Sequence, residues 1–276
     1  MMETLLFLAT PFAACVILVL ILCYFGNHIL SRGVIFVDIA VAQVAALGTM
    51  IGILLGASEG SLFSLLISLG FTLIIVSAFA VSKFQHKELS QEVIIGIIYC
   101  MALAIAYLLV DSVPGGSNFV QKTFTGAILW VTWSDILKTG LLFAVVGIVH
   151  LLIYQKTLAI TENRKSEMTA AAVRLYDLIF YITFGFVVVE SVKIGGIFVV
   201  FMFLIGPAAI AMFLASTWRM RFLLSWSAGL VGSFFGILLS YKFNFPNGPT
   251  IVCILGAMLL TTALVSRKRV NQTSNT

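Results

Sequence analysis

Asp38 is the residue whose type and position most clearly allow chemistry, because its carboxylate lies inside a long apolar run. The run extends from Gly33 to Gly56 and also contains the side-chain amide of Gln43. About 20 apolar residues are enough to cross a bilayer core. A carboxylate in such a segment costs about 2.5–3.5 kcal/mol on insertion, which indicates a transport pathway, a partner or a ligand. The alternatives are a hydrogen-bonded aspartate at a helix start and an ion pair with Arg32.

Two other acids have a basic residue three positions away. Asp177 follows Arg174, and Glu190 precedes Lys193, each at the spacing that forms ion pairs on a helix. We interpret both acids as paired in this way. Asp38 has no basic residue at i+3 or i+4, so it stands apart from them.

Histidines and cysteines offer few further sites. Two histidines, His28 and His86, lie in basic loops and are expected on the solvated surface, whereas His150 lies in an apolar segment with a packing or a pathway role. The cysteines all lie in apolar runs without a CxxC pair, which is typical of small buried hydrophobes. They are Cys15, Cys23, Cys100 and Cys253.

Motifs for catalysis and for nucleotide binding are missing from the sequence. The nearest approach to a phosphate-binding loop, Gly116 to Thr123, has Gln121 in place of the second glycine and no strand before it. There is no HExxH motif and no evident nucleophile with its base. We therefore expect a protein that is not an enzyme and has no covalently bound cofactor, and any ATP hydrolysis would belong to a separate chain.

The composition is that of a polytopic membrane protein. Hydrophobic residues make up 61% of the 276 residues and charged residues 10%, with a mean hydropathy of +1.13. Soluble domains carry about 25% charged residues. The net charge of +5 fits basic loops on the inner side of a membrane and needs no nucleic-acid partner. We expect an all-α bundle, with residues 1–276 as a single transmembrane domain in the lipid bilayer.

The apolar runs predict about eight or nine transmembrane helices. The nine candidate spans cover residues 5–26, 34–57, 61–82, 92–110, 135–155, 173–191, 194–215, 222–241 and 249–265. With the N-terminus outside, the inner loops hold 12 of the 16 Lys and Arg residues. This bias predicts an N-out, C-in orientation.

Three segments depart from simple spans. Residues 111–134 are polar and then apolar, which indicates an outer loop with a re-entrant or interfacial segment. Residues 156–174 form the longest inner loop, with a short surface helix expected over Ser166–Ala172. Residues 190–196 are expected to be a tight outer turn between two spans. Gly206 and Pro207 then predict a kink within the span that follows.

Glycines spaced four apart predict where the second span packs. Gly48, Gly52 and Gly56 would form one smooth strip on a helix. Small residues at this spacing let another helix approach closely in a membrane. We therefore expect a tight helix contact along this face.

Five pieces of sequence together resemble the permease family of ABC importers for zinc, manganese and iron. The first is the basic residue, aspartate and small-residue helix around Asp38. The others are Glu92–Ile97, Phe124–Asp135, Ser191–Ala209 with the basic turn Arg219–Arg221, and Phe245–Val252. They occur in order over about residues 10–265.

The resemblance implies a subunit of an ATP-driven importer in the bacterial cell (inner) membrane. It implies two cytoplasmic ATPase subunits, an extracytoplasmic metal-binding protein, and a second permease copy or a related permease. A divalent metal ion would be the transported substrate. The inner loop 156–174 would dock on the ATPase, through Ser166, Glu167 and the run Ala170, Ala171 and Ala172, where the family often has a glycine.

The metal site departs from the family pattern, in which a histidine follows the aspartate by four residues. Here that position is Ala42, and Gln43 stands one residue later. On an α-helix the i+4 position lies about 40° from Asp38 and the i+5 position about 140° away. Either the histidine is lost or a π-bulge brings Gln43 back beside Asp38. A carboxylate with an amide is an all-oxygen pair, which favours manganese or magnesium over zinc.

Other functions remain open from the sequence. An importer permease for a metal chelate or a vitamin would need a wider and less charged path. An ion-coupled secondary transporter predicts inverted repeats and charged pairs at mid-membrane, neither of which we find. A non-transporting scaffold does not account for the Gly-Pro span or for Asp38.

Overall fold

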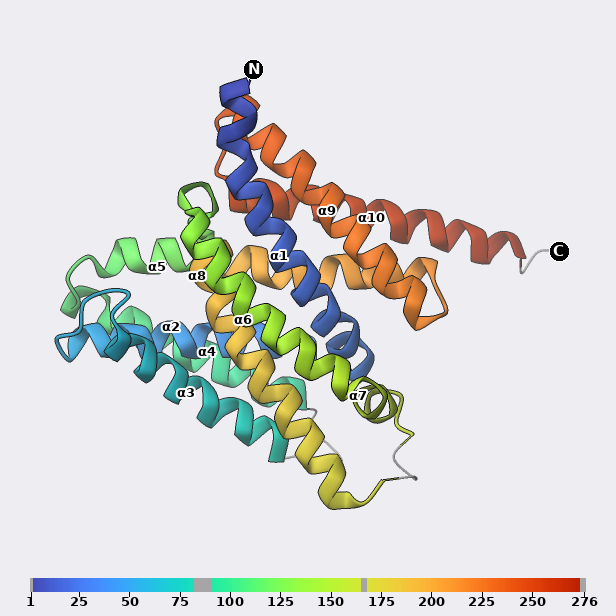
Figure 1. Ribbon diagram of the computed structural model, residues 1–276, viewed down its shortest axis with the longest axis horizontal. Helices are drawn as coiled ribbons and strands as arrows, with labels where there is room; N and C mark the ends of the chain where they lie inside the picture. The colour runs from blue at the N-terminus through green and yellow to red at the C-terminus, as the bar shows by residue number, and fades with distance from the viewer. Residues whose placement is uncertain (1, 82–90, 165–167, 274–276) are drawn as a thin grey trace. The chain divides into compact units, whose positions relative to one another are not determined.

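Helices make up the computed structural model, which describes residues 2–81, 91–164 and 168–273 (Figure 1). Within these ranges there is no strand. The elements are α1 (Met2–Arg32), α2 (Val37–Leu54), α3 (Leu62–Val81), α4 (Gln91–Leu109), η1 (Val110–Ser112), α5 (Gly116–Thr125), η2 (Ile128–Trp130), α6 (Trp133–Leu152), α7 (Tyr154–Thr161), α8 (Ala170–Leu214), α9 (Trp218–Phe243) and α10 (Asn247–Thr273). The predicted all-α fold is confirmed.

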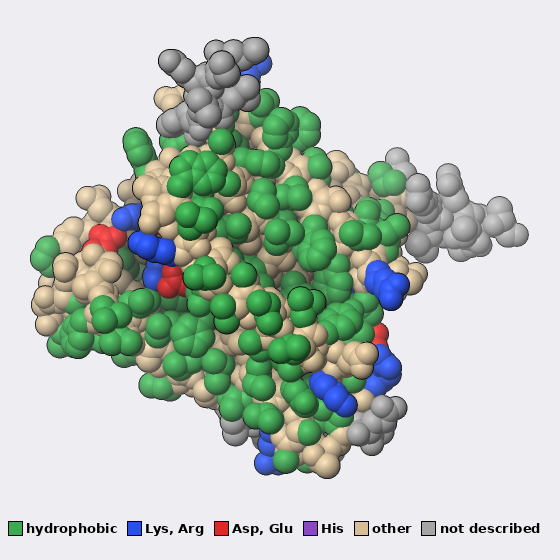
Figure 2. Space-filling view, in the orientation of Figure 1, with side chains coloured by type: hydrophobic (Ala, Val, Ile, Leu, Met, Phe, Trp, Pro, Cys, Tyr) green, Lys and Arg blue, Asp and Glu red, His purple; other side chains and the backbone are tan. Residues whose placement is uncertain are grey.

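Eight of these helices are long and apolar enough to cross a membrane. This number agrees with the expected eight or nine spans. It is eight instead of nine because α8 covers both the sixth and the seventh predicted span. The face of the molecule seen in Figure 2 is covered mainly by hydrophobic side chains, with charged side chains gathered in a few places. Such a surface suits contact with lipid, because it presents few side chains that can hydrogen-bond to water.

Helix α8 joins the sixth and seventh predicted spans. Its 45 residues are about twice the number that a bilayer requires. Only Gly196 leaves helical geometry, with φ 73° and ψ 166°. The expected break between two spans over residues 190–196 is found at Gly196, where two helices meet at a kink, and it takes one residue instead of a turn of seven. Pro207 lies inside α8, and the backbone break precedes it.

The contacts group the chain into two compact units. The first comprises residues 1–30, 125–141 and 194–276, and the second comprises residues 31–124 and 142–193. Each unit combines segments that are distant in the sequence.

The first unit brings backbone segments together at glycines. A Cβ on Gly26 would lie 1.9 Å from the carbonyl oxygen of Leu204, so α1 and α8 approach closely there. Beside the α8 break, the backbone N–H of Ala127 donates to the carbonyl of Ile194 at 3.0 Å. Gly126 (φ 73°) would clash with Gly195 if it carried a Cβ. The carbonyl of Ile194 beside the break is thus hydrogen-bonded, as irregular backbone inside a membrane protein requires.

The predicted re-entrant or interfacial segment, residues 111–134, forms short helical pieces. They are the end of η1, then α5, η2 and the start of α6. The ten residues of α5 are too few to span a bilayer.

The second unit is built around α2. Thirteen of its 18 residues are buried, and most of them are Ala, Val or Gly. Helix α2 packs against α3 and α4. A Cβ on Gly48 would lie 2.8 Å from the Cα of Ser68, and one on Gly52 would lie 3.0 Å from the Cα of Ser64. These two glycines therefore let the α3 backbone approach α2.

Gly56 does not belong to this strip. Helix α2 ends at Leu54, and Gly56 adopts φ 94° in the turn that follows, with open space around it. Its expected packing role is wrong because the helix ends before it. Gly56 instead allows the turn, since its positive φ is a backbone conformation that other residues rarely adopt.

Gly48→Ala is expected to destabilise the protein by about 1–3 kcal/mol, since the added methyl must displace the α3 backbone. The matched control is Gly70→Ala on α3, where a Cβ meets nothing within 4 Å. Thermal unfolding of the purified protein in detergent measures both. Equal melting temperatures for the two variants would contradict the close contact.

Candidate functional site

Asp38 lies in the first turn of α2 and is fully buried. Within the described part of the chain, neither of its carboxylate oxygens has a hydrogen-bonding side chain as partner. The groups that face it are backbone N–H groups of Asp38 itself and of Ile39, which the open turn of a helix leaves free. A buried carboxylate in this state lacks the partner that such groups normally have.

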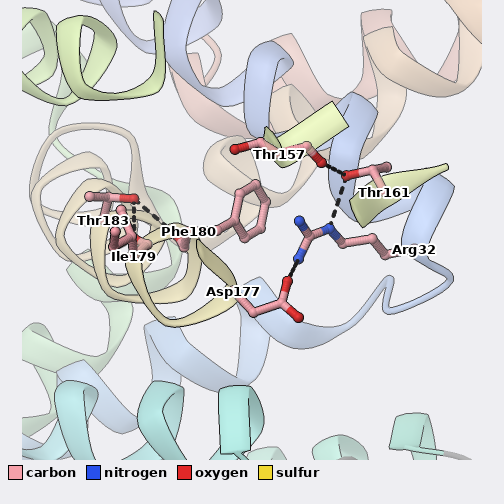
Figure 3. A network of polar contacts seen from close by, with 7 residues as sticks. All are labelled: Arg32, Thr157, Thr161, Asp177, Ile179, Phe180 and Thr183. Carbon is pink, nitrogen blue, oxygen red and sulfur yellow. Dashed lines mark hydrogen bonds and ion pairs between the residues drawn. The ribbon is translucent and has the colours of Figure 1, made fainter. Parts of the chain in front are cut away.

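Arg32 is not that partner. Its guanidinium makes an ion pair with Asp177 at 2.9 Å and donates to the hydroxyl of Thr161 at 3.2 Å. Figure 3 shows the guanidinium between these two side chains. The alternative of an Arg32–Asp38 pair is therefore wrong. Asp177, for which the spacing suggested Arg174, pairs with Arg32 from a distant part of the sequence.

Among the described residues, Glu92 in the first turn of α4 is a charged neighbour of Asp38. One carboxylate oxygen of Glu92 accepts a hydrogen bond from the backbone N–H of Ile35, just before α2 begins. The other oxygen has no partner among the described residues. The packing of α2 on α4 thus places two acids at the start of α2. Sequence reasoning did not assign Glu92 to the site, although both acids open an apolar helix.

Gln43 does not share this position. It is buried, and its side-chain oxygen has no partner in the described part of the chain. Helix α2 is described throughout and is α-helical from end to end, without a π-bulge. Asp38 and Gln43 therefore lie on different faces. No group of three or more His, Cys, Asp or Glu side chains comes together within the described ranges.

The Arg32 network ties three segments of the second unit together (Figure 3). Arg32 stands at the end of α1, Thr161 at the end of α7, and Asp177 in α8. The guanidinium also lies 4.0 Å from the ring centroid of Phe180, a cation–π contact. Buried charge on Arg32 is thus neutralised, in contrast to the two acids near α2.

The described histidines and the Lys193–Glu190 pair make contacts that fit structural roles. His150 lies 2.8 Å from the hydroxyl of Thr183, which fits the packing role. His28 is fully buried and stacks on Trp218 at 5.0 Å, so the expectation of a solvated histidine is wrong. His86 lies outside the described residues. Lys193 pairs with Glu190 at 2.5 Å, as predicted.

The cysteines divide into two groups. Cys15 and Cys23 are buried as expected, whereas Cys100 and Cys253 are exposed on the outside of their helices. The expectation of burial is wrong for these two, because the apolar runs that hold them turn part of their surface outward. All four are free thiols.

The expected ATPase-docking loop, residues 156–174, contains most of α7 and the start of α8. Ala170 and Ala171 are exposed and Ala172 is partly buried, and all three belong to the first turn of α8. The hydroxyl of Thr169 accepts from the N–H of Ala172, which caps this turn. A separate helix over Ser166–Ala172 is therefore wrong in its second half, and Ser166 and Glu167 lie outside the described residues.

A cavity of about 500 Å³ lies at the other end of α2 from Asp38. Its wall combines hydroxyl, charged and apolar side chains from α2, α3, α5 and α8, with the α2–α3 turn at one side. The residues are Ala45, Ala46, Thr49, Glu59, Gly60, Ser64, Leu65, Ser68, Phe119, Lys122, Thr123, Val189, Val192 and Lys193. All of them belong to the second unit.

Several transport proteins are similar to this chain. A probable metal transport system membrane protein of Chlamydia pneumoniae is 27% identical over 68% of this chain and 64% of its own length. The manganese transport system membrane protein MntC of Halalkalibacterium halodurans is 23% identical over 92% of this chain and 85% of its own. The chelated iron transport system membrane protein YfeC of Yersinia pestis is 26% identical, over 65% and 61%. The chain thus spans less than two thirds of the Chlamydia and Yersinia relatives.

Two solved structures share the fold. PsaBC from Streptococcus pneumoniae, in complex with Fab, has a TM-score of 0.77 at 19% identity and covers 95% of this chain and 93% of its own. A putative metal-chelate type ABC transporter in an inward-facing conformation has a TM-score of 0.70 at 16% identity, over 92% and 85%.

The model of the ABC 3 transport family matches residues 4–266. This match covers nearly the whole chain, and it agrees with the helical fold and the apolar spans. The chain therefore belongs to the ABC 3 transport family and is a multi-pass membrane protein.

Proposed function

We propose that this chain is the membrane-spanning subunit of an ATP-driven importer for a divalent transition metal ion. The observation that carries the proposal is the fully buried Asp38, whose carboxylate meets no hydrogen-bonding side chain in the described part of the chain. In a bilayer, such an acid marks an ion pathway or a ligand site. A cation at this position would supply the missing partner.

Glu92 adds a second negative charge to the same place. Two carboxylates repel each other, and a divalent cation between the starts of α2 and α4 would relieve that repulsion. The unpartnered oxygens, two on Asp38 and one on Glu92, are hard ligands. Hard oxygen ligands suit manganese better than zinc. Gln43 would take no part unless α2 rearranges, because it lies on another face.

The energy for transport would come from ATP bound by partner ATPase subunits that dock on α7 and on the first turn of α8. The Arg32 network joins these two helices, since Arg32 bonds both Thr161 and Asp177. A movement of α7 would thus reach α8 through the hydrogen bond and the ion pair that Arg32 makes. A binding protein on the outer side and a second permease copy would complete the importer.

Asp38→Asn is expected to lower metal uptake by about tenfold or more, because it removes the charge while keeping the shape. Glu92→Gln is expected to lower uptake to a smaller extent. Its amide oxygen can still accept from the N–H of Ile35, so the turn before α2 stays in place. Uptake of manganese, iron and zinc by cells or proteoliposomes with the complete importer measures both variants.

The control for these acids is Asp111→Asn, since Asp111 is exposed in η1. Normal uptake by Asp38→Asn would exclude the carboxylate as part of the path. If free ions leave transport unchanged while a chelated metal drives it, the substrate is a chelate. A chain that transports without any ATPase partner would indicate a secondary transporter.

Asp177→Asn is expected to destabilise the protein by about 3–5 kcal/mol, because it leaves the Arg32 guanidinium buried without a counter-charge. Glu162→Gln serves as the control, since the Arg164–Glu162 pair is on the surface and is worth at most about 1 kcal/mol. Thermal unfolding compares the two. A double variant, Arg32→Met with Asp177→Leu, should recover much of the stability yet still weaken metal-stimulated ATP hydrolysis. Full stimulation in that stable double variant would show that the network does not transmit movement.

A further inference from the structure

The cavity of about 500 Å³ at the far end of α2 has a charged end. The charged side chains of its lining are Glu59, Lys122 and Lys193. Glu59 lies in the turn between α2 and α3, and Lys122 lies on α5. Because that turn joins two apolar spans, it lies at the boundary of the bilayer. The lining therefore places two ammonium groups against one carboxylate at the level of the lipid headgroups.

Both lysines keep hydrogen-bond donors after their ion pairs. Lys122 lies 2.9 Å from Glu59, and Lys193 lies 2.5 Å from Glu190, which does not line the cavity. A lysine ammonium has three N–H donors, and each ion pair uses one of them. The spare donors and the surplus of positive charge on the lining fit an anionic oxygen group such as a phosphate.

The lining becomes apolar away from this charged end. Its apolar side chains come from α2, α3 and α8, and they include Ala45, Ala46, Leu65, Val189 and Val192. Ala45 stands nine residues before the last residue of α2, which is roughly 14 Å along a helix. The cavity thus reaches from the headgroup level toward the hydrocarbon core.

The hydroxyls in the deeper part of the lining are already hydrogen-bonded to the helices. Ser68 donates to the carbonyl of Ala45 at 2.8 Å, and Thr49 donates to the same carbonyl at 3.1 Å. Ser64 donates to the carbonyl of Thr49 at 3.4 Å. Since a hydroxyl has only one proton to donate, these side chains do not require a polar ligand. A hydrocarbon chain can therefore lie beside them.

The first turns of α3 border both the cavity and the outer surface. Ser64 and Leu65 line the cavity, whereas Leu62, Phe63 and Leu66 are exposed. In Figure 2, charged side chains gather over α5 beside a surface of hydrophobic side chains. A lipid that covers the exposed face of α3 is therefore next to the cavity.

We propose that this cavity binds one anionic phospholipid, with its phosphate at Lys122 and Lys193 and one acyl chain along the apolar lining. The second chain lies on the exposed face of α3. A volume of about 500 Å³ is within the range of about 300–1,000 Å³ that ligand pockets have. A free phosphate ion shares the headgroup chemistry, but it would leave the apolar part of the cavity empty. This site is separate from Asp38 and does not depend on the proposed transport of metal.

Native mass spectrometry of the full chain in detergent tests the proposal with three probes. They are dioleoylphosphatidylglycerol, dioleoylphosphatidylcholine and inorganic phosphate. We expect one phosphatidylglycerol to bind about fivefold more tightly than phosphatidylcholine, whose extra positive charge is repelled by the lysines. Inorganic phosphate should not displace it. Equal affinity for the two lipids would overturn the selection for an anion, and displacement by phosphate would identify the free ion as the ligand and overturn the lipid.

Lysine variants locate the phosphate. Lys122→Met and Lys193→Met should each weaken phosphatidylglycerol binding by about fivefold, the contribution of one lysine to the binding of anionic lipid. Their side chains are about half exposed, 56% and 47%, so both variants should fold. The matched control is Lys138→Met, since Lys138 is exposed on α6 and does not line the cavity. If all three variants bind the lipid alike, the phosphate is not at this cavity.

A change at Glu59 gives the sign of the ligand. Glu59→Gln should strengthen phosphatidylglycerol binding, because it removes a negative charge and releases the donor of Lys122 that pairs with it. Weaker binding in this variant would contradict an anionic headgroup beside Lys122.

A bulky side chain in the apolar part tests the acyl chain. Val192→Trp should weaken phosphatidylglycerol binding, because the indole ring takes the space of the chain while both lysines remain. The control is Val231→Trp on α9, where Val231 is exposed and does not line the cavity. Equal lipid binding by these two variants would show that no chain enters the cavity.

Discussion

The close approach of α2 and α3 is the contact on which the second unit depends. Gly48 and Gly52 let the α3 backbone come within a distance that any Cβ would prevent. At that distance the hydroxyls of Ser64 and Ser68 donate hydrogen bonds to carbonyls of α2. The same packing buries α2 over most of its length, including Asp38 at its start. Helix association in a membrane relies on such packing and hydrogen bonds, because lipid is as apolar as the helices.

The second unit contains two kinds of buried charge, one paired within the protein and one without a partner side chain in the described part of the chain. Each kind fits a different role. Arg32 is paired with Asp177, bonded to Thr161 and packed on Phe180, so its charge is compensated within the protein. Asp38 and Glu92 together present carboxylate oxygens without a partner among the described residues. A compensated network fits a structural connection between α7 and α8. An uncompensated pair of acids fits a place where a cation passes, because such a pair is costly without one.

The fold and the family agree, but neither identifies the ion. Relatives named for manganese and for chelated iron have similar levels of identity to this chain. Function depends on particular side chains placed on a shared fold. In the function proposed for this chain, those side chains are Asp38 and Glu92. The ligands in this proposal are oxygen atoms only, and Ala42 stands where the family pattern has a histidine.

The sequence by itself determined the membrane class, most of the spans and the family, because each depends on local composition and order. Tertiary structure decided which residues meet. The pairing of Arg32 with Asp177 joins residues 145 positions apart, and no local spacing reveals it. Likewise, the break at Gly196 instead of a loop, the end of α2 before Gly56, and the place of Glu92 beside Asp38 depend on helix packing. The cavity of about 500 Å³ follows from the same cause, because α2, α3, α5 and α8 must pack before their side chains can line one space.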